Sequence, residues 1–226
     1  AAPAPAPSAE AHPSSAASPP PTLDYHDYTH RGGSGQGPKE NQDAHFILRV
    51  DEQSCVFGVL DGHGGMHGRI AAQAASRAMR DFFKTHFGRV LSSPEAAMRE
   101  AFRTGHEAIH EAILAQSHVF ERDGMLCMEV DEEEWHLGYD AVDGGTTASV
   151  AIILEGGRRL VYGAVGDSAG ILASAGTAEV VELVAEHTPT RLDEWEARLS
   201  AAGAEGAYDH PDLFEGDEYM LRVFRR

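Results

Sequence analysis

The sequence predicts an α+β fold built mainly from antiparallel sheets. Two short apolar segments, 44–50 and 55–62, precede two longer segments whose apolar residues recur at helical spacing. Two further apolar segments, 146–156 and 158–167, follow the helices and are joined by a short turn. Strands that come in pairs joined by short turns form antiparallel hairpins, and helices grouped between such pairs are typical of α+β proteins.

The first strand pair, AHFILRV and CVFGVLDG, is joined by the polar turn DEQS and is expected to be a hairpin. Its second strand carries apolar residues over 56–60 and then places Asp61 and His63 among glycines. A turn is one explanation, because Asp and Gly are ordinary turn residues. The other is that a buried strand holds a carboxylate rigidly for a metal ion. This short motif by itself does not separate the two explanations.

Two helices are predicted next. The segment Gly64–Phe87 carries apolar residues at helical spacing, which predicts a helix buried along one face. A second helix begins at Ser93, with this residue as N-cap, Pro94 in the first turn and Glu95 after it. The faces expected to pack in the core are Met66, Ile70, Ala74, Ala78 and Phe82 in the first helix and Met98, Ala101, Phe102, Ile109 and Ile113 in the second.

The second half of the chain begins with the acidic segment Glu129–Asp143. We expect a solvated loop there, because the alternating acidic pattern of a calcium-binding loop is absent. The strands 146–156 and 158–167 then meet at the turn Gly156–Gly157. The remaining predicted elements are a strand pair over 168–176 and 178–186 and a short amphipathic helix over 190–203.

Composition excludes several classes of protein. The 226 residues include 18 Lys and Arg and 36 Asp and Glu, for a net charge of −18, which argues against nucleic acid or an anionic membrane as the main partner. The two cysteines, Cys55 and Cys127, form no CxxC motif, so neither a disulfide framework nor a cysteine zinc site is expected. We therefore expect a reducing, intracellular compartment, with the organelle left open. The sequence contains no apolar stretch long enough to span a bilayer.

The first 24 residues differ in composition from the rest of the chain. They are rich in Ala, Pro and Ser and contain almost no large apolar side chain. Such a segment cannot bury enough apolar surface to offset the entropy of ordering. We expect a disordered leader over 1–24 and a folded domain over 25–226.

Three carboxylates occur at comparable positions in the predicted strands. Asp43 precedes one strand, Asp61 ends the next, and Asp167 ends the strand 158–167. Hard cations such as Mg²⁺ and Mn²⁺ prefer oxygen ligands. Gly62 offers a backbone carbonyl without a Cβ to obstruct it. His63 is placed to donate a proton, although a lone loop histidine is more often only a surface residue.

Four segments in order, KENQDAHF, VFGVLDGHGG, GGTTASVAI and VYGAVGDSAG, resemble the metal-dependent protein Ser/Thr phosphatases of type 2C, the PPM family. The resemblance covers residues 37–226. It implies a four-layer αββα sandwich of two antiparallel sheets flanked by helices. It also implies hydrolysis of phosphoserine and phosphothreonine in phosphoprotein substrates by a water activated between Mg²⁺ or Mn²⁺ ions, two or three in number.

The resemblance also implies a set of metal ligands. Asp61 would bridge two ions, and the carbonyl of Gly62 would bind one of them. Asp43 would act through metal-bound water, and Asp167 would belong to a third, weaker site. Gln42 lies where many members carry Glu; its amide oxygen can still accept a hydrogen bond from a metal-bound water but brings no charge.

The remaining roles concern the phosphate and the leaving group. The resemblance implies that His63 is the general acid and that Thr146–Thr147 support the site from a neighbouring strand. Some members hold the phosphate with an Arg at the position of Pro38. Lys39, in preference to Arg31, is expected to serve here, unless it is only a solvated loop charge.

The chain departs from the family pattern at its end. Two later family motifs, an SDG and a DN whose acids bind metal, do not occur before Arg226, and the strands that close the sandwich are expected to be missing. The chain is therefore expected to be the N-terminal portion of a phosphatase domain. The alternative is a catalytically impaired scaffold, held in a larger assembly by a protein partner that covers the incomplete sheets. A generic acidic cation-binding domain leaves the ordered motifs unexplained.

Overall fold

The computed structural model describes residues 23–31, 33–34, 37–38, 40–130, 138–174, 176–187, 204–208 and 221–225. For residues 33–34, 37–38, 204–208 and 221–225 it describes the backbone alone. Residues 1–22 of the predicted leader and the helix predicted over 190–203 lie outside this part of the chain.

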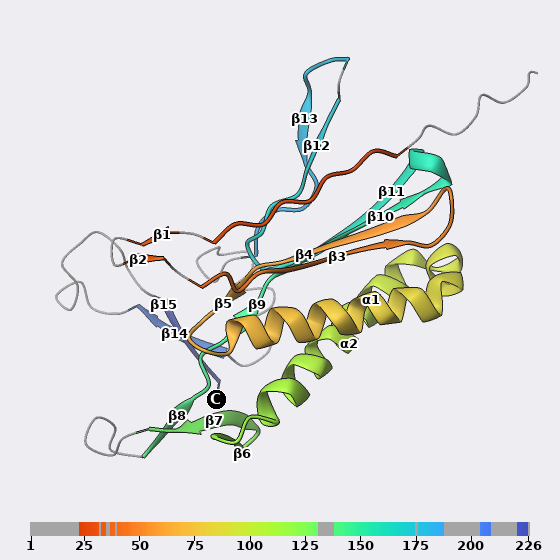
Figure 1. Ribbon diagram of the computed structural model, residues 1–226. Coiled ribbons are helices and arrows are strands. Elements are labelled where there is room, and N and C mark those ends of the chain that lie inside the picture. The colour runs from red at the N-terminus through yellow and green to blue at the C-terminus, as the bar shows by residue number, and fades with distance from the viewer. Residues whose placement is uncertain are drawn as a thin grey trace, which may run out of the picture.

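One four-stranded antiparallel sheet forms the centre of the molecule. Its strands are β3 (Ala44–Arg49), β4 (Cys55–Leu60), β10 (Ala148–Leu154) and β11 (Arg159–Val165), in the order β11-β10-β4-β3. Both predicted hairpins are present, and β4 of the first pairs with β10 of the second. The predicted α+β class with antiparallel sheets is confirmed. Of the four layers of the predicted sandwich, the described residues supply one helical layer and this sheet (Figure 1).

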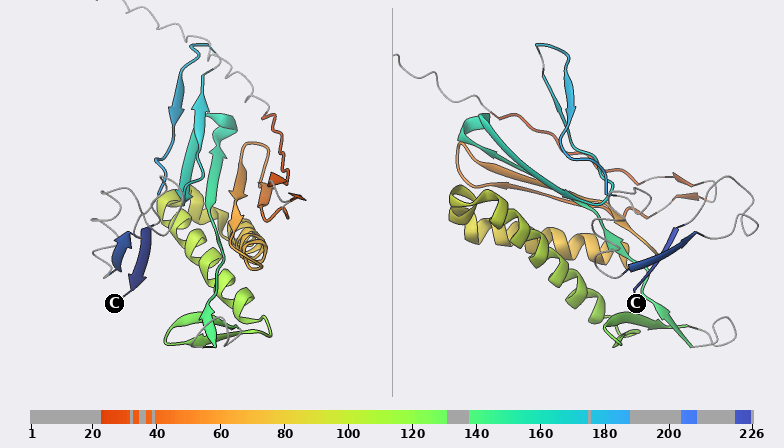
Figure 2. Two further views of the ribbon diagram at one scale, coloured as in Figure 1. Left: turned by 90° about the vertical axis from the view of Figure 1, so that its left-hand side faces the viewer. Right: turned by 180° about the vertical axis from the view of Figure 1, so that it is seen from behind.

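Two long helices cover one face of this sheet. They are α1 (Gly68–Ser92) and α2 (Pro94–Leu114), and both lie on the same side in every view (Figures 1 and 2). The apolar face predicted for the second helix is confirmed, because all five of its residues are buried or half-buried. Of the face predicted for the first helix, Phe82 is buried and Ile70, Ala74 and Ala78 are half-buried, whereas Met66 does not fit. Met66 precedes the helix and is 64% exposed, while the most buried positions are Ala71, Ala72, Ala75, Met79, Phe83 and Val90.

The boundary between the helices lies where it was predicted but is built differently. Ser93 is the N-cap of α2 and Pro94 is the first helical residue, yet the Ser93 side chain makes no capping hydrogen bond. The same residue is also the C-cap of α1, and its backbone N–H donates to the carbonyl of Arg89. This double role sets the backbone of Ser93 at φ −152° and ψ 75°. The predicted start of the second helix, with Ser93 as N-cap, Pro94 in the first turn and Glu95 after it, is confirmed.

The core lies between the helices and the sheet. Val56, Leu60, Val150 and Ile152 point from the sheet toward Met79 and Phe83 of α1, and all six side chains are almost fully buried. Burial of each such side chain stabilises the fold by roughly 1.5–3 kcal/mol. The sheet edge that carries the candidate site therefore rests on a packed layer.

A second, smaller sheet was not predicted. Its strands β6 (Val119–Arg122), β7 (Met125–Glu129) and β8 (Tyr139–Ala141) follow α2 in the order β6-β7-β8. The prediction of a loop over 129–143 is wrong at both ends, because Glu129 pairs with Tyr139. Phe120 packs against Tyr139, so contacts across the sheet outweigh the acidic composition of the segment.

The remaining elements are short. The strand pair predicted over 168–176 and 178–186 is confirmed as a hairpin of three paired residues in each strand, and the predicted turn at Gly156–Gly157 lies in a 3₁₀ turn. None of the helices in the described part of the chain is long and apolar enough to cross a membrane. The short elements are β1 (Gly33–Ser34), β2 (Gly37–Pro38), β5 (Gly62–His63), β9 (Gly145–Thr146), η1 (Glu155–Gly157), β12 (Ile171–Ala173), β13 (Val180–Glu182), β14 (Ala204–Tyr208) and β15 (Leu221–Arg225).

Gly58 gives a test of the core. It lies directly opposite Phe46 in the sheet, and a Cβ added to Gly58 would come 2.1 Å from the Phe46 ring. We expect Gly58→Ala to lower the free energy of unfolding in urea by about 1–3 kcal/mol, because the buried ring has to move. Phe46→Leu should restore part of this loss when the two changes are combined.

Gly88→Ala is the matched control, because a Cβ there meets nothing within 4 Å. Gly88 lies inside α1, so this change should stabilise the protein by about 0.5–1 kcal/mol. Equal effects of the two alanines would contradict the packing described here.

Candidate active site at one edge of the sheet

The first two predicted carboxylates lie at the ends of neighbouring strands. Ala44 pairs with Leu60, so Asp43 just before β3 and Asp61 just after β4 lie at the same edge of the sheet. Neighbouring strands are about 5 Å apart, which brings the two residues close together. Both side chains are exposed to solvent. This edge therefore carries two neighbouring carboxylate residues.

The third predicted carboxylate lies at the same edge but farther along it. Ala148 of β10 pairs with Val165 of β11, and Asp167 follows in the turn after β11. Because β10 lies between β4 and β11, two strand spacings, roughly 10 Å, separate this turn from Asp61. Within the described ranges, no three His, Cys, Asp or Glu side chains gather closely enough to hold one ion. The metal-binding roles of these acids stay predictions.

Gly62 occupies a position where no other residue fits. A Cβ there would lie 2.3 Å from the carbonyl oxygen of Gln42 and 2.6 Å from that of Gly68. Gly62 is buried and belongs to β5, which pairs with β9 and not with the main sheet. The chain therefore leaves the sheet directly after Asp61 and packs tightly against the start of α1.

The loop between Gly62 and α1 is held by Gln42. The side-chain amide of Gln42 donates a hydrogen bond of 2.7 Å to the carbonyl of Gly65. Gly64 has φ +85°, a conformation that favours glycine. Gln42 thus contacts the glycine loop through its donor group, whereas the resemblance had suggested a role for its amide oxygen.

Thr146 and Thr147 hold the backbone of Asp61. The N–H of Asp61 donates to the hydroxyl of Thr147 at 3.1 Å, and the N–H of Thr147 donates to the carbonyl of Asp61 at 2.9 Å. The Thr146 hydroxyl lies 3.0 Å from the same carbonyl and donates to it. Thr147 is only 4% exposed. These bonds bring both predicted supporting residues into contact with Asp61.

His63 lies on β5, directly opposite Gly145 of β9. Its side chain is exposed, and a Cβ at Gly145 would come within 3.3 Å of the imidazole ring. The missing side chain of Gly145 therefore leaves room for the ring beside Thr146. Lys39, the predicted phosphate-binding residue, lies outside the part of the chain that the structure describes.

Another histidine, His67, lies below this loop. It is 2% exposed, and its Nε2 lies 3.1 Å from Nε2 of His118, where one ring donates a hydrogen bond to the other. This bond ties the residue before α1 to the turn after α2. A Cβ on Gly144 would come 2.5 Å from the Cβ of His67.

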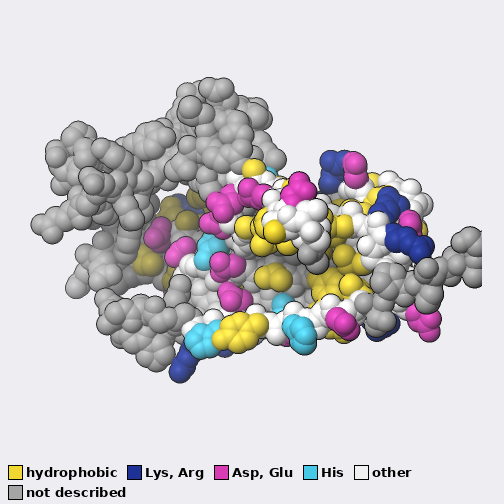
Figure 3. Space-filling model, turned by 90° about the horizontal axis from the view of Figure 1, so that it is seen from above, with side chains coloured by type: hydrophobic (Ala, Val, Ile, Leu, Met, Phe, Trp, Pro, Cys, Tyr) yellow, Lys and Arg dark blue, Asp and Glu magenta, His cyan; other side chains and the backbone are white. Residues whose placement is uncertain are grey.

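Among the charged side chains in the middle of the face seen from above, most are acidic. Figure 3 shows Asp and Glu across that part of the surface, with most visible Lys and Arg toward its right-hand end. Such a distribution favours cations over anions near the middle of this face.

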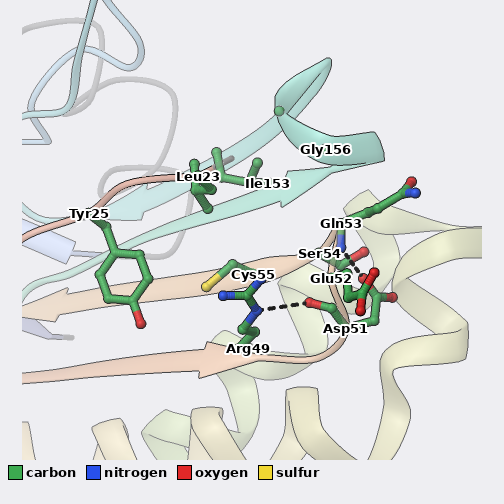
Figure 4. A pocket seen from close by; sticks show the side chains of 11 residues that line it. Leu23, Tyr25, Arg49, Asp51, Glu52, Gln53, Ser54, Cys55, Ile153 and Gly156 are labelled. Atoms are coloured by element: carbon green, nitrogen blue, oxygen red, sulfur yellow. Dashed lines mark hydrogen bonds between the residues drawn. The ribbon is translucent and has the colours of Figure 1, made fainter. Parts of the chain in front are cut away.

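A pocket lies at the opposite end of β3 and β4 from the candidate site. Figure 4 shows Arg49 and Cys55 there, with Leu23 and Tyr25 of the N-terminal segment on the other side. Burial raises the pKa of the Cys55 thiol, so it stays protonated at neutral pH and is a poor nucleophile. Both cysteines are free and buried. This pocket contains none of the predicted site residues.

Ser168 was not among the predicted site residues. Its hydroxyl lies 2.6 Å from the hydroxyl of Thr147, which in turn contacts Asp61. The available signal was its place directly after Asp167 in the segment VYGAVGDSAG.

Comparison with known proteins gives consistent matches. The sequence model of the protein phosphatase 2C family matches residues 36–195. The chain is 30% identical over 150 residues to "Probable protein phosphatase 2C 76" of Arabidopsis thaliana, covering 66% of this chain and 28% of that protein. It is 31% identical over 154 residues to "Probable protein phosphatase 2C 52" of Oryza sativa subsp. japonica, covering 68% and 24%. The chain thus spans less than a third of either relative.

Among solved structures, serine-threonine phosphatase 2C from Toxoplasma gondii superposes with a TM-score of 0.48 at 15% identity. The superposition covers 81% of this chain and 56% of that one.

The two glycines of the loop provide a matched test. We expect Gly62→Ala to destabilise the protein by about 1–3 kcal/mol or more, because its Cβ would collide with two backbone carbonyls. Gly65→Ala should change stability by less than about 0.5 kcal/mol, since its nearest neighbour lies at an ordinary contact distance of 3.8 Å. Urea unfolding measures both, and a Gly62→Ala variant as stable as Gly65→Ala would overturn this description of the loop.

Proposed function

The chain belongs to the protein phosphatase 2C family, and we propose that it carries out metal-dependent hydrolysis of phosphoserine and phosphothreonine in proteins. One observation supports this most directly. Asp43 and Asp61 end neighbouring strands, and His63 follows two residues later at the same edge. All three residues lie within the matched range 36–195. We propose further that residues 25–226 belong to one phosphatase domain.

The oxygen atoms available as ligands at this edge fit a hard divalent cation. Carboxylate and carbonyl oxygens are the ligands that Mg²⁺ and Mn²⁺ prefer, and the tight packing at Gly62 leaves no room for a side chain. We propose that Asp43, Asp61, the Gly62 carbonyl and Asp167 hold two or three Mg²⁺ or Mn²⁺ ions. When bound, such ions lower the pKa of a water molecule and so provide the group that attacks phosphorus.

The side chains of the chain itself have separate tasks in this proposal. Hydrogen bonds with Thr147 hold the backbone of Asp61 in place. In this proposal the residue therefore needs little reorganisation during the reaction. His63 donates a proton to the serine or threonine oxygen as that group leaves. Gln42 holds the glycine loop through the carbonyl of Gly65, and Lys39 binds the phosphate by charge attraction.

A protein partner is the further part of this proposal. The hairpin of β12 and β13 exposes Ile171, Leu172, Val180 and Val181, whose exposed fractions are 67%, 52%, 60% and 49%. Contiguous apolar side chains on a surface mark sites that another polypeptide covers. We propose that a protein partner packs against this hairpin.

Activity of this chain is tested with a phosphothreonine peptide. We expect hydrolysis that depends on Mn²⁺ or Mg²⁺ and stops in EDTA. Removing a residue that only supports a metal ligand typically lowers metal affinity or activity about 10–100-fold. Asp61 is a direct ligand in this proposal, so Asp61→Asn should lower the rate of hydrolysis at least about 100-fold. Asp81→Asn on the exposed surface of α1 is the control and should leave the rate unchanged. A folded chain without metal-dependent turnover would contradict the proposal.

The role of His63 is tested by changing the leaving group. A general acid contributes about 10²–10⁴-fold when the leaving oxygen is basic and much less when it is acidic. We therefore expect His63→Gln to slow hydrolysis of the phosphothreonine peptide far more than that of p-nitrophenyl phosphate. Equal slowing of both substrates would mean that His63 has another function.

A further inference from the structure

Ser168 directly follows Asp167 in the chain, and its side chain reaches Thr147, which contacts Asp61. Its hydroxyl is 2.6 Å from that of Thr147, and the Thr147 hydroxyl accepts the N–H of Asp61 at 3.1 Å. We propose that Ser168 is a positioning residue. It orients the Thr147 hydroxyl, and thereby fixes the backbone of Asp61 relative to the turn that carries Asp167. The consequence for metal binding rests on the proposed function, whereas the linkage itself does not.

The Thr147 hydroxyl has few alternatives to this arrangement. A hydroxyl has one proton and two lone pairs. One lone pair accepts the Asp61 N–H, and the short contact with Ser168 uses either the proton or the second lone pair. Thr147 is 4% exposed, so water cannot readily replace a lost partner. Without Ser168, the Thr147 hydroxyl keeps only its bond to the Asp61 N–H, so its rotation is less restricted and the Asp61 backbone is held less firmly.

Gly166 supports the same threonine from the other side. It has φ +98°, and a Cβ there would lie 2.8 Å from the Thr147 methyl carbon. Only glycine therefore lets the turn lie directly over Thr147. The methyl group faces Gly166, and the hydroxyl lies between Asp61 and Ser168, which together define one orientation of the side chain.

The turn itself does not depend on the Ser168 hydroxyl. The N–H of His187 donates to the carbonyl of Gly166 at 2.9 Å, and the hydroxyl of Ser149 donates to the carbonyl of Ser168 at 3.3 Å. Both bonds use backbone carbonyls that remain after substitution of the Ser168 side chain. Ser168→Ala should therefore fold and lose only the link to Thr147.

The experiment compares four single variants of the chain and one double variant. Ser168→Ala removes the hydroxyl, Ser168→Thr keeps it, and Thr147→Val removes the hydroxyl that Ser168 contacts. Ser76→Ala is the control, because the buried Ser76 hydroxyl donates to the carbonyl of His45 and has no bond to Asp61, Thr147 or Ser168. Amide hydrogen exchange of Asp61, measured by NMR without metal, reports the linkage directly. Calorimetric titration with Mn²⁺ measures the affinity for the ion, which is the proposed consequence of the linkage.

We expect Ser168→Ala to reduce protection of the Asp61 amide and the affinity for Mn²⁺ each by about 3–10-fold, the effect of one hydrogen bond. Ser168→Thr should restore both, and Ser76→Ala should change neither. Adding Ser168→Ala to Thr147→Val should have little further effect, because both act on one contact.

Two results would overturn the inference: unchanged protection of Asp61 in Ser168→Ala, or independent effects of Thr147→Val and Ser168→Ala. If the unsubstituted chain binds no Mn²⁺, the proposed function fails. Amide exchange at Asp61 then still decides whether Ser168 positions this residue.

Discussion

The antiparallel pairing of β4 with β10 is the interaction on which the candidate site depends. Val59 pairs with Ser149, so the end of one strand meets the start of the other. Asp61 and Thr147 consequently face each other and exchange two hydrogen bonds, of 3.1 and 2.9 Å. A shift of one residue in this register would turn Asp61 toward the other face of the sheet and break both bonds.

Close packing below the site explains why glycines are concentrated there. A Cβ at Gly62, Gly68 or Gly144 would approach another residue of the loop or of the helix start to 2.5–2.6 Å. The loop after Asp61 and the beginning of α1 thus form one tightly packed unit. Because α1 is itself held against the sheet by the core, the position of the loop follows from the packing of the whole helix.

The charges at this edge bear on the metal binding proposed above. Asp43 precedes β3 and Asp61 follows β4, and neighbouring strands lie about 5 Å apart, a spacing at which two like charges repel each other. Their exposure to water reduces the repulsion, but the chain also carries a net charge of −18, which adds to it. A divalent cation between such groups would remove a destabilising interaction. This is the physical link between the fold of the edge and the metal-dependent activity proposed for it.

Local patterns in the sequence were enough to predict the hairpins, the two helices and the order of the motifs. These elements can be recognised in the sequence because side chains alternate between the two faces of a strand and recur about every 3.6 residues on one face of a helix. The prediction for α1 was wrong at Met66, which precedes the helix and is exposed, and the strands β6 to β8 were not predicted. Both errors concern contacts between segments distant in the chain, such as Phe120 with Tyr139.

The sequence by itself determined which chemical groups stand at the ends of the strands: Asp43, Asp61, His63 and Asp167. Only the tertiary structure decided their spacing, because the insertion of β10 between β4 and β11 separates Asp167 from Asp61 by two strands. It also decided that Gln42 contacts the loop through its amide donor, and that Ser168 reaches Thr147. Such contacts depend on strand order and side-chain rotation, which periodicity along one segment does not encode.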